Sequence, residues 1–432
     1  MKILVEPSAH GMVNVGDAGM LQVASRRLRK LWPHASIGVI TEVPERLAGL
    51  CPDTTPVPAG GRRLWLETPN LSATLYQRLP SAAARGLRTA EQAVRVRWPS
   101  VTSATIRLRR RSKALGSAEL DEFLDWLYSA DLVVVSGAGL LADPFAPRAC
   151  TVLELLETAV RRGAATAMFG QGVGPLGDAR LKAAARRVLP RVDLIGLREE
   201  RAGRPILRSL GVADRQLVTT GDDAIELAFE AGGSSLGSGI GVGVRVARYS
   251  GATNRAVAAI ARAVRRAATH HRAELVPVPI SSYIKERDAT VIAQVIGVDE
   301  GMVPELDSPA AVIDQVQRCR VVVSGSYHGA VFALAQGIPA VGLAGTGYYV
   351  HKFDGLAELF GGGCTSVALD QPALEDRLEA AIEHAWGSAP AMAPKLLAAA
   401  ERQLEAGMEA YRRLRCILSR RDVEFVRGGR GK

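Results

Sequence analysis

The sequence lacks the cysteine pattern of a disulfide framework or of a structural zinc site. Its five cysteines are an odd number, lie far apart and include no Cys-x-x-Cys pair: Cys51, Cys150, Cys319, Cys364 and Cys416. Disulfide frameworks need paired cysteines, and zinc sites need closely spaced ligands. We therefore expect reduced thiols and no bound metal. The pair His270-His271, at the end of a predicted helix, is expected to be structural.

Long hydrophobic runs are also missing. The longest candidate, residues 329–347, contains Gln336, Pro339 and several glycines, so two ordinary elements explain it better than a membrane span. The opening MKILVEPSAHG passes straight from a strand into a loop and lacks the apolar stretch of a signal peptide. We expect a cytoplasmic protein whose only membrane contact would be peripheral, at the inner face.

Aromatic residues are scarce, and the charge is unbalanced. Aromatics make up 5% of the chain, and no familiar nucleic-acid-binding module is present, so we expect no nucleic-acid partner. Lysine and arginine number 54 against 44 acidic residues, a net charge of +10. This excess favours anionic partners, such as phosphorylated small molecules, acidic glycans or a lipid surface.

The length and the alternation of elements predict two α/β domains. The chain has 432 residues, more than one hydrophobic core usually holds. Strand-like and helix-like segments alternate on both sides of the flexible stretch AGGSSLGSG, as in parallel sheets. We predict two facing Rossmann-like domains, glycosyltransferase-B-like, with an interdomain cleft. The predicted parts are a first domain (1–231), a linker (232–239), a second domain (240–393) and a brace helix with a basic tail (394–432). The sequence contains no feature that specifies an oligomeric state.

A basic segment interrupts the first domain at about residues 47–117. It is rich in proline, and its part from Arg85 to Arg111 carries many arginines among alanine, valine, leucine and Trp98. Such a helix could lie on anionic lipid headgroups. The alternative is a solvated helical face over a core.

The segment SGSYHGAVFALAQGIPAVGLAGTGYYVHK, residues 324–352, predicts a ligand site. A strand ending at Ser324, a helix that stops at Gly337 and a second strand form a parallel βαβ unit. Parallel sheets bind ligands beyond the carboxyl ends of their strands, and helix-start amides favour anions. His328 lies in that turn, and histidine exchanges protons near neutral pH. The alternative is that His328 only caps or packs the helix.

This segment resembles the C-terminal motif of the polysaccharide pyruvyl transferases, Ser-x-Arg-x-His-Gly followed by a helix, Gly-x-Pro and a later lysine. Ser324, His328, Gly329 and Lys352 match it, whereas Ser326 stands where the family has arginine. The family also begins with a strand and Asn-x-Gly-Asp, which resembles Asn14, Gly16 and Asp17 here. Three further stretches resemble family motifs: SGAGL with Gly139, GQGVGPL with Gln171 and Gly172, and GLREER with Arg198.

The resemblance implies transfer of a pyruvyl group from phosphoenolpyruvate to a sugar of a cell-surface polysaccharide or a lipid-linked precursor, as a ketal. No cofactor besides this donor substrate is implied. His328 would be the acid/base and Asp17 an accessory base, although Asp17 has capping of the first helix as its alternative role. Arg198 and Lys352 would anchor carboxylate and phosphate. Arg245, at a strand end of the second domain, and Arg248 are the candidates to replace the motif arginine. The other expected substrate-binding residues are Asn14, Gly16, Gly139, Gln171, Gly172, Ser324, Ser326 and Gly329.

Two other classes of function stay open at this point. A nucleotide-sugar-dependent glycosyltransferase would use the same pair of domains and the same histidine at a helix start. A non-catalytic protein that binds anionic glycans would need the cations but no turnover. Identification of the donor that the protein binds discriminates the three.

Overall fold

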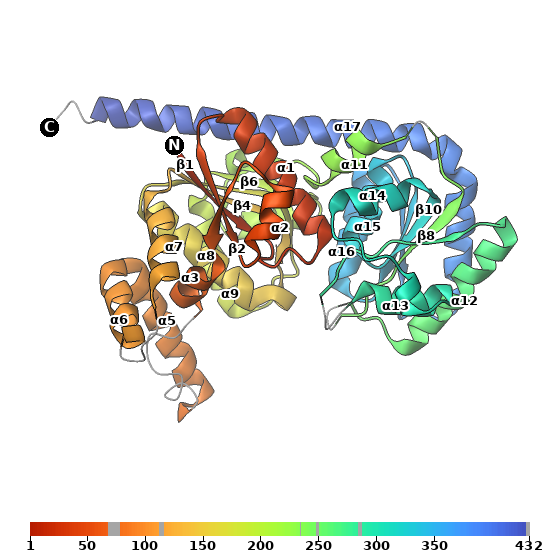
Figure 1. The fold of residues 1–432 in the computed structure, drawn as a ribbon, viewed down its shortest axis with the longest axis horizontal. Helices are drawn as coiled ribbons and strands as arrows, with labels where there is room; N and C mark the ends of the chain where they lie inside the picture. Colours follow the sequence, from red (N-terminus) through yellow and green to blue (C-terminus); the bar gives the residue numbers. More distant parts are fainter. Residues whose placement is uncertain (68–77, 112–115, 234, 248–249, 284–286, 429–432) are drawn as a thin grey trace.

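The computed structural model describes residues 1–67, 78–111, 116–233, 235–247, 250–283 and 287–428. These residues form two parallel α/β domains, side by side, with one long helix along both (Figure 1). The predicted fold class is therefore confirmed. Arg248 and the last residues of the predicted basic tail, 429–432, lie outside the described residues.

In the described part of the chain, the first sheet has seven parallel strands in the order β3-β2-β1-β4-β5-β6-β7. The strands are β1 (Lys2–Pro7), β2 (Ser36–Thr41), β3 (Thr55–Pro58), β4 (Leu132–Leu141), β5 (Ala165–Val173), β6 (Leu194–Leu197) and β7 (Leu217–Thr219). The helices are α1 (Val15–Leu31), α2 (Pro44–Leu50), α3 (Ala59–Leu66), α5 (Ser81–Arg97), α6 (Pro99–Arg111), α7 (Ala118–Ser129), α8 (Ala146–Arg161), α9 (Ala179–Val188), α10 (Gly203–Ser209) and α11 (Ile225–Ala231).

The second sheet, within the described residues, has five parallel strands in the order β12-β11-β10-β8-β9. Its strands are β8 (Gly239–Gly243), β9 (Leu275–Pro277), β10 (Cys319–Ser324), β11 (Ala340–Ala344) and β12 (Cys364–Ala368). The helices are α12 (Asn254–His271), α13 (Asp288–Ile296), α14 (Pro309–Gln317), α15 (Tyr327–Ala335), α16 (Gly347–Leu359) and α17 (Leu374–Gly428).

Each sheet has a point at which the strand order reverses. In the first sheet, β1 and β4 are neighbours, and the later strands are added outward from each of them in opposite directions. In the second sheet, β8 and β10 are the corresponding neighbours. Helices that follow the two central strands lie on opposite faces there and leave a crevice at the carboxyl edge. The loop after β1 pairs with the segment after β9, since Val15 N donates to Ile280 O at 2.9 Å and Ser282 N to Val13 O at 2.9 Å. The two crevices are thereby held facing each other.

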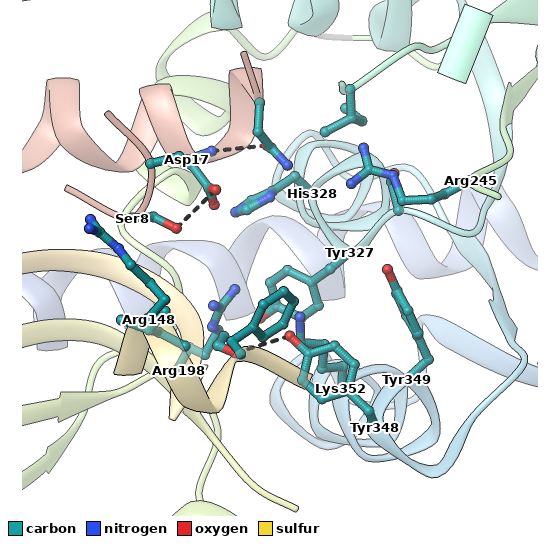
Figure 2. A pocket seen from close by; sticks show the side chains of 17 residues that line it. Ser8, Asp17, Arg148, Arg198, Arg245, Tyr327, His328, Tyr348, Tyr349 and Lys352 are labelled. Atoms are coloured by element: carbon teal, nitrogen blue, oxygen red, sulfur yellow. Dashed lines mark hydrogen bonds between the residues drawn. The ribbon is translucent and has the colours of Figure 1, made fainter. Parts of the chain in front are cut away.

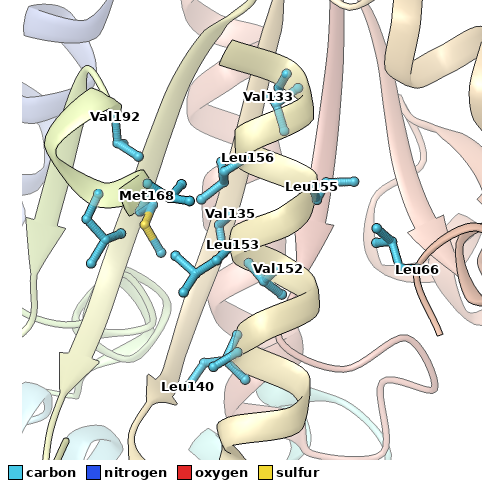
Figure 3. Packing of buried hydrophobic residues seen from close by; sticks show 14 of the residues in the cluster. Leu66, Val133, Val135, Leu140, Val152, Leu153, Leu155, Leu156, Met168 and Val192 are labelled. Atoms are coloured by element: carbon cyan, nitrogen blue, oxygen red, sulfur yellow. The ribbon is translucent and has the colours of Figure 1, made fainter. Parts of the chain in front are cut away.

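In the core of the first domain, α8 packs on β4 and β5 (Figure 3). Leu153 and Leu156 of α8 pack in the same buried cluster as Val133, Val135 and Met168 of the strands. All five side chains are fully buried. Because both faces of a parallel sheet are covered, its strands are apolar along their whole length, as the sequence of β4 shows up to Val135.

Helix α17 joins the cores of both domains. Leu378 and Ile382 belong to a cluster of the second domain, and Leu396 belongs to the one that contains α15. Further along, Tyr411 and Leu414 pack with strands of the first sheet. Figure 1 shows the helix turning from the side of the second domain onto the top of both. It contains Pro390 and Pro394, and proline bends helices.

Two predicted boundaries differ from the structure. The helix that was expected to begin at residue 394 begins at Leu374, because its two prolines bend it without ending it. The segment predicted as an insertion, 47–117, contributes β3, which pairs with β2. Pro56 and Pro58 are tolerated in β3 because it is an edge strand, so this part of the segment belongs to the sheet. None of the helices in the described residues combines the length and apolar composition needed to cross a membrane.

Replacing Tyr411 with phenylalanine is expected to lower the free energy of unfolding by about 1–3 kcal/mol. Tyr411 Oη donates to Asp223 at 2.9 Å, and this carboxylate also accepts from Arg27 at 2.8 Å. Burial raises the pKa of Asp223 to about 6, although Arg27 and the hydrogen bond from Tyr411 act in the opposite direction. The ionised carboxylate is therefore stabilised by the groups that donate hydrogen bonds to it. Chemical denaturation measures the change. Tyr128→Phe is the control, because the buried Tyr128 hydroxyl has no partner among the described residues. Equal losses in both variants would contradict the expectation.

Candidate functional site

The carboxyl edges of both sheets face a cavity of about 290 Å³ between the domains (Figure 2). Most of the lining residues follow the end of a strand. From the first domain come Ser8 after β1, Gly139 within the end of β4, Arg148 on α8 and Arg198 after β6, together with Asn14 and Asp17. From the second come Arg245 after β8, Ser326, Tyr327 and His328 after β10, and Tyr348, Tyr349 and Lys352 after β11.

His328 lies in the first turn of α15 and is almost fully buried. Its ring packs directly on Gly16 of α1, where a Cβ atom would lie 2.0 Å from the imidazole. Nε2 of His328 lies 3.5 Å from Oδ2 of Asp222 and forms no hydrogen bond with any described residue. The histidine is thus held between a glycine and a carboxylate, with a ring nitrogen available to a ligand. It packs the helix and lines the cavity at the same time.

Arg198 forms a buried ion pair with the same carboxylate. Its Nη1 donates to Asp222 Oδ2 at 3.2 Å, and its guanidinium carbon lies 4.6 Å from the centroid of Tyr327. Burial alone would raise the pKa of Asp222, but His328 and Arg198 outweigh it and hold this pKa below its usual value. The Nε of Arg198 has no hydrogen-bond partner among the described residues. Since buried polar groups are normally paired, this donor is suited to an anionic ligand.

Lys352 is enclosed by aromatic rings. Its Nζ lies 4.1 Å from the ring centroid of Tyr348, 5.4 Å from that of Tyr327 and 5.6 Å from that of Tyr349. Burial lowers the pKa of Lys352 well below its usual value, and the neighbouring Arg198 lowers it further. A bound anion would restore the charged form.

Asp17 faces the cavity from the start of α1. It accepts a hydrogen bond from Ser8 Oγ at 3.0 Å. Asn14 is the N-cap of α1, because its Oδ1 accepts from Gly16 N at 3.0 Å and from Asp17 N at 3.2 Å. The interpretation of Asp17 as the cap is therefore wrong. A cap has extended backbone and precedes the first helical turn, and Asn14 occupies that position.

Arg245 lines the cavity, with its guanidinium held in a buried pair. Its Nε and Nη2 donate to the two oxygens of Asp288 at 3.0 and 2.9 Å. Asp288 also accepts from the backbone of Ile280 and Ser281. Ser326 lines the same cavity, and its buried hydroxyl has no partner among the described residues.

The remaining predicted residues support the cavity without lining it. Gly172 leaves room for Arg198, since a Cβ there would lie 3.1 Å from Nε. Ser324 Oγ bonds to the backbone of Ser326 and packs on Gly329, so both shape the turn before α15. Gln171 is fully buried and donates to Phe169 O within its own strand at 2.8 Å. These three, Ser324, Gly329 and Gln171, do not line the cavity.

The structure adds Arg148 and the tyrosines to the predicted set. Arg148 Nη2 donates to the fully buried Glu6 at 2.6 Å and lies 2.9 Å from a ring nitrogen of His10. Burial would raise the pKa of Glu6, but Arg148 and Arg62 outweigh it and hold this pKa far below its usual value. The sequence contains one indication of Tyr348 and Tyr349. They precede Lys352 by four and three residues, so the three side chains lie on one face of a helix. Nothing local in the sequence distinguishes Arg148.

One group of potential metal ligands occurs in the described residues, away from this cavity. His270, His271 and Glu383 lie within 4.8 Å of one another at the surface. His271 Nε2 lies 2.9 Å from Glu383 Oε1, and its ring stacks on Trp386. These contacts account for the position of His271 without a metal.

Replacing Gly16 with alanine is expected to displace the His328 ring and to reduce turnover by about tenfold or more, since a small misplacement of a catalytic group is costly. Gly49→Ala is the matched control, because a Cβ at Gly49 in α2 meets no atom within 4 Å. Steady-state kinetics with the donor proposed below provide the measurement. Unchanged turnover in the Gly16 variant would show that the contact with His328 does not matter.

Two Rossmann-like domains that face each other across this cavity give the chain a glycosyltransferase-B-like architecture. A family profile described as polysaccharide pyruvyl transferase matches residues 14–346, more than half of the chain. The chain belongs to this family and is a transferase. No curated protein sequence matches it.

Solved structures share the architecture at low sequence identity. UDP-GlcNAc 2-epimerase from Neisseria meningitidis bound to UDP-GlcNAc is 13% identical, with a TM-score of 0.54, and the match covers 95% of this chain and 100% of that one. A ugt transferase from Siraitia grosvenorii in complex with UDP is 11% identical, with a TM-score of 0.52 and coverages of 97% and 99%. At these identities the likeness extends to the fold alone.

Proposed function

We propose that this transferase moves a pyruvyl group from phosphoenolpyruvate to a sugar, as a ketal. The observation that carries the proposal is the concentration of cations around one small cavity: Arg148, Arg198, Arg245 and Lys352, together with His328. Phosphoenolpyruvate bears a carboxylate and a phosphate on neighbouring positions, and it needs cations on both. A cavity of about 290 Å³ is at the lower end of small-molecule sites, which favours this compact donor over a nucleotide sugar.

The proposed roles follow from the geometry. Arg198, with its unpaired Nε, and Lys352 would bind the carboxylate and the phosphate, while Arg245 and Ser326 complete the anion site in place of the motif arginine. His328, beside Asp222, would carry the proton that is delivered to the methylene carbon of the donor. Asp17 would accept the proton of an acceptor hydroxyl.

The reaction then balances without a redox cofactor. Protonation of the methylene carbon makes the phosphate-bearing carbon electrophilic, and the first sugar hydroxyl adds to it and loses its proton. Phosphate leaves as its carbon–oxygen bond breaks. A second hydroxyl closes the ketal ring and loses its proton. Of the two hydroxyl protons, one balances the proton delivered to the methylene carbon and the other leaves with the phosphate. We place the enzyme in the cytoplasm, in the assembly of a cell-surface polysaccharide or a lipid-linked precursor.

Thermal stabilisation by ligands tests the choice of donor. The purified protein is heated with phosphoenolpyruvate or with each member of a panel of nucleotide sugars. Selective stabilisation by phosphoenolpyruvate is expected, because binding only to the folded state raises the melting temperature. A shift with a nucleotide sugar alone would contradict the proposal and identify a glycosyltransferase.

Donor binding is expected to take up protons and to weaken as the pH rises. Lys352 has a lowered pKa in the free protein, so part of the population is neutral at a pH above that value. A bound anion raises this pKa again, and the proton comes from the buffer. Calorimetry in buffers with different ionisation enthalpies measures the uptake. Lys352→Arg is the control, because arginine stays charged and should bind the donor without that uptake. Equal uptake in the variant and the wild type would contradict the role of Lys352.

A further inference from the structure

Helices α5 and α6 project from the first domain at the end remote from the second domain (Figure 1). The exposed side of α6 carries large apolar side chains. Val101 and Leu108 are 59% and 71% exposed, and Trp98, just before the helix, is 56% exposed. Thr102, Ser103 and Ile106 form the buried side of the helix. A helix that covers a core in water normally turns its large apolar side chains inward, so a second, exposed apolar set is unusual.

The exposed apolar side chains share one face of the helix. Val101 and Leu108 are seven residues apart, two helical turns, and Trp98 precedes Val101 by three residues. Large side chains of this kind contribute the most to apolar burial when a surface is covered. A stripe of exposed tryptophan, valine and leucine therefore indicates a surface that is covered in use.

The charge of the same two helices has one dominant sign. Residues 81–111 contain eight arginines and one acidic residue, Glu91, which is itself buried. In α6 every charged residue is an arginine, and Arg107 forms an ion pair with Asp121 of α7. Arg97 and Arg111 are exposed at the two ends of the stripe. An apolar stripe flanked by arginine, with tryptophan at its edge, is typical of helices that lie in the interface of an anionic membrane.

We propose that this face, formed by Trp98, Val101 and Leu108 with Arg97 and Arg111, docks on an anionic lipid bilayer. Apolar side chains would enter the headgroup boundary, and arginines would pair with lipid phosphates. A second copy of the chain is a poorer partner, because it would bring two arginine-rich surfaces together. An acidic glycan would satisfy the arginines and leave the apolar stripe in water. The proposal does not depend on the identity of the donor, since it concerns a surface outside the cavity.

Vesicle sedimentation with the full chain tests the proposal. Vesicles of phosphatidylcholine are compared with vesicles that also contain phosphatidylglycerol. We expect binding to the anionic vesicles, weakening at high salt, and at least tenfold weaker binding by the variant Trp98→Ser, Val101→Ser, Leu108→Ser. The control is Met302→Ser, because Met302 is 72% exposed but lies in the second domain, and this variant should bind like the wild type.

A second readout reports on insertion directly. Lipids with brominated acyl chains should quench part of the tryptophan fluorescence, and Trp98→Phe should remove that quenching. Equal vesicle binding by the wild type and the triple variant, or no binding to anionic vesicles, would overturn the proposal. Self-association of the wild type that the triple variant loses, measured by sedimentation velocity, would assign the face to a second copy instead.

Discussion

Replacement of Arg198 by alanine is expected to weaken phosphoenolpyruvate binding by about 100-fold or more, because truncating one partner of a buried charge pair costs several kcal/mol. Arg198 lines the cavity, its Nε is unpaired among the described residues, and its guanidinium is fixed by Asp222 and Tyr327. Arg198→Lys should show an intermediate loss, since lysine keeps the charge but not the planar fork. Calorimetric titration measures both.

A control separates binding from stability in this experiment. Arg198→Ala leaves Asp222 buried without its partner, which is expected to destabilise the fold by about 3–5 kcal/mol. Arg201→Ala lies in the same loop, but its exposed pair with Glu358 is far weaker, so it should affect neither property. Wild-type affinity in a folded Arg198 variant would show that the donor does not contact this arginine.

Replacement of His328 by glutamine is expected to reduce turnover by about 100- to 10,000-fold, the range for loss of a general acid/base. Donor affinity should change much less, because the guanidinium and ammonium groups remain. The contrast between turnover and affinity distinguishes a chemical role from a binding role. His351→Gln is the control, since His351 is exposed on α16, one residue from Lys352. Parallel losses of affinity and turnover would make His328 a binding residue.

Sequence patterns predicted the parts of the site that are local. The run from β10 through α15 encodes a strand, a turn and a helix in consecutive residues, so the position of His328 at the sheet edge followed from the pattern. The same reasoning applies to Arg198, directly after β6, and to Arg245, after β8. Side chains at strand ends meet whenever parallel strands share an edge.

Contacts between distant segments were not predictable from the pattern. Arg148 reaches the cavity because Glu6 of β1 holds it, and the two are 142 residues apart. The packing of Gly16 on His328 joins the two domains, and no property of either segment alone indicates it. Aspartate and asparagine are both common N-cap residues, so the sequence does not distinguish Asp17 from Asn14. The backbone conformation at the start of α1 shows that Asn14 is the cap. The edge strand β3 was missed because its prolines resemble a loop.

The most direct test of ketal transfer follows the atoms of the donor. The protein is incubated with phosphoenolpyruvate labelled with carbon-13 at the phosphate-bearing carbon and with sugars that carry two neighbouring free hydroxyls. Nuclear magnetic resonance should then show a new ketal carbon on the sugar, with one phosphate released per ketal formed. Unchanged phosphoenolpyruvate, together with consumption of a nucleotide sugar under the same conditions, would contradict the proposal and make the cavity the site of a glycosyl transfer.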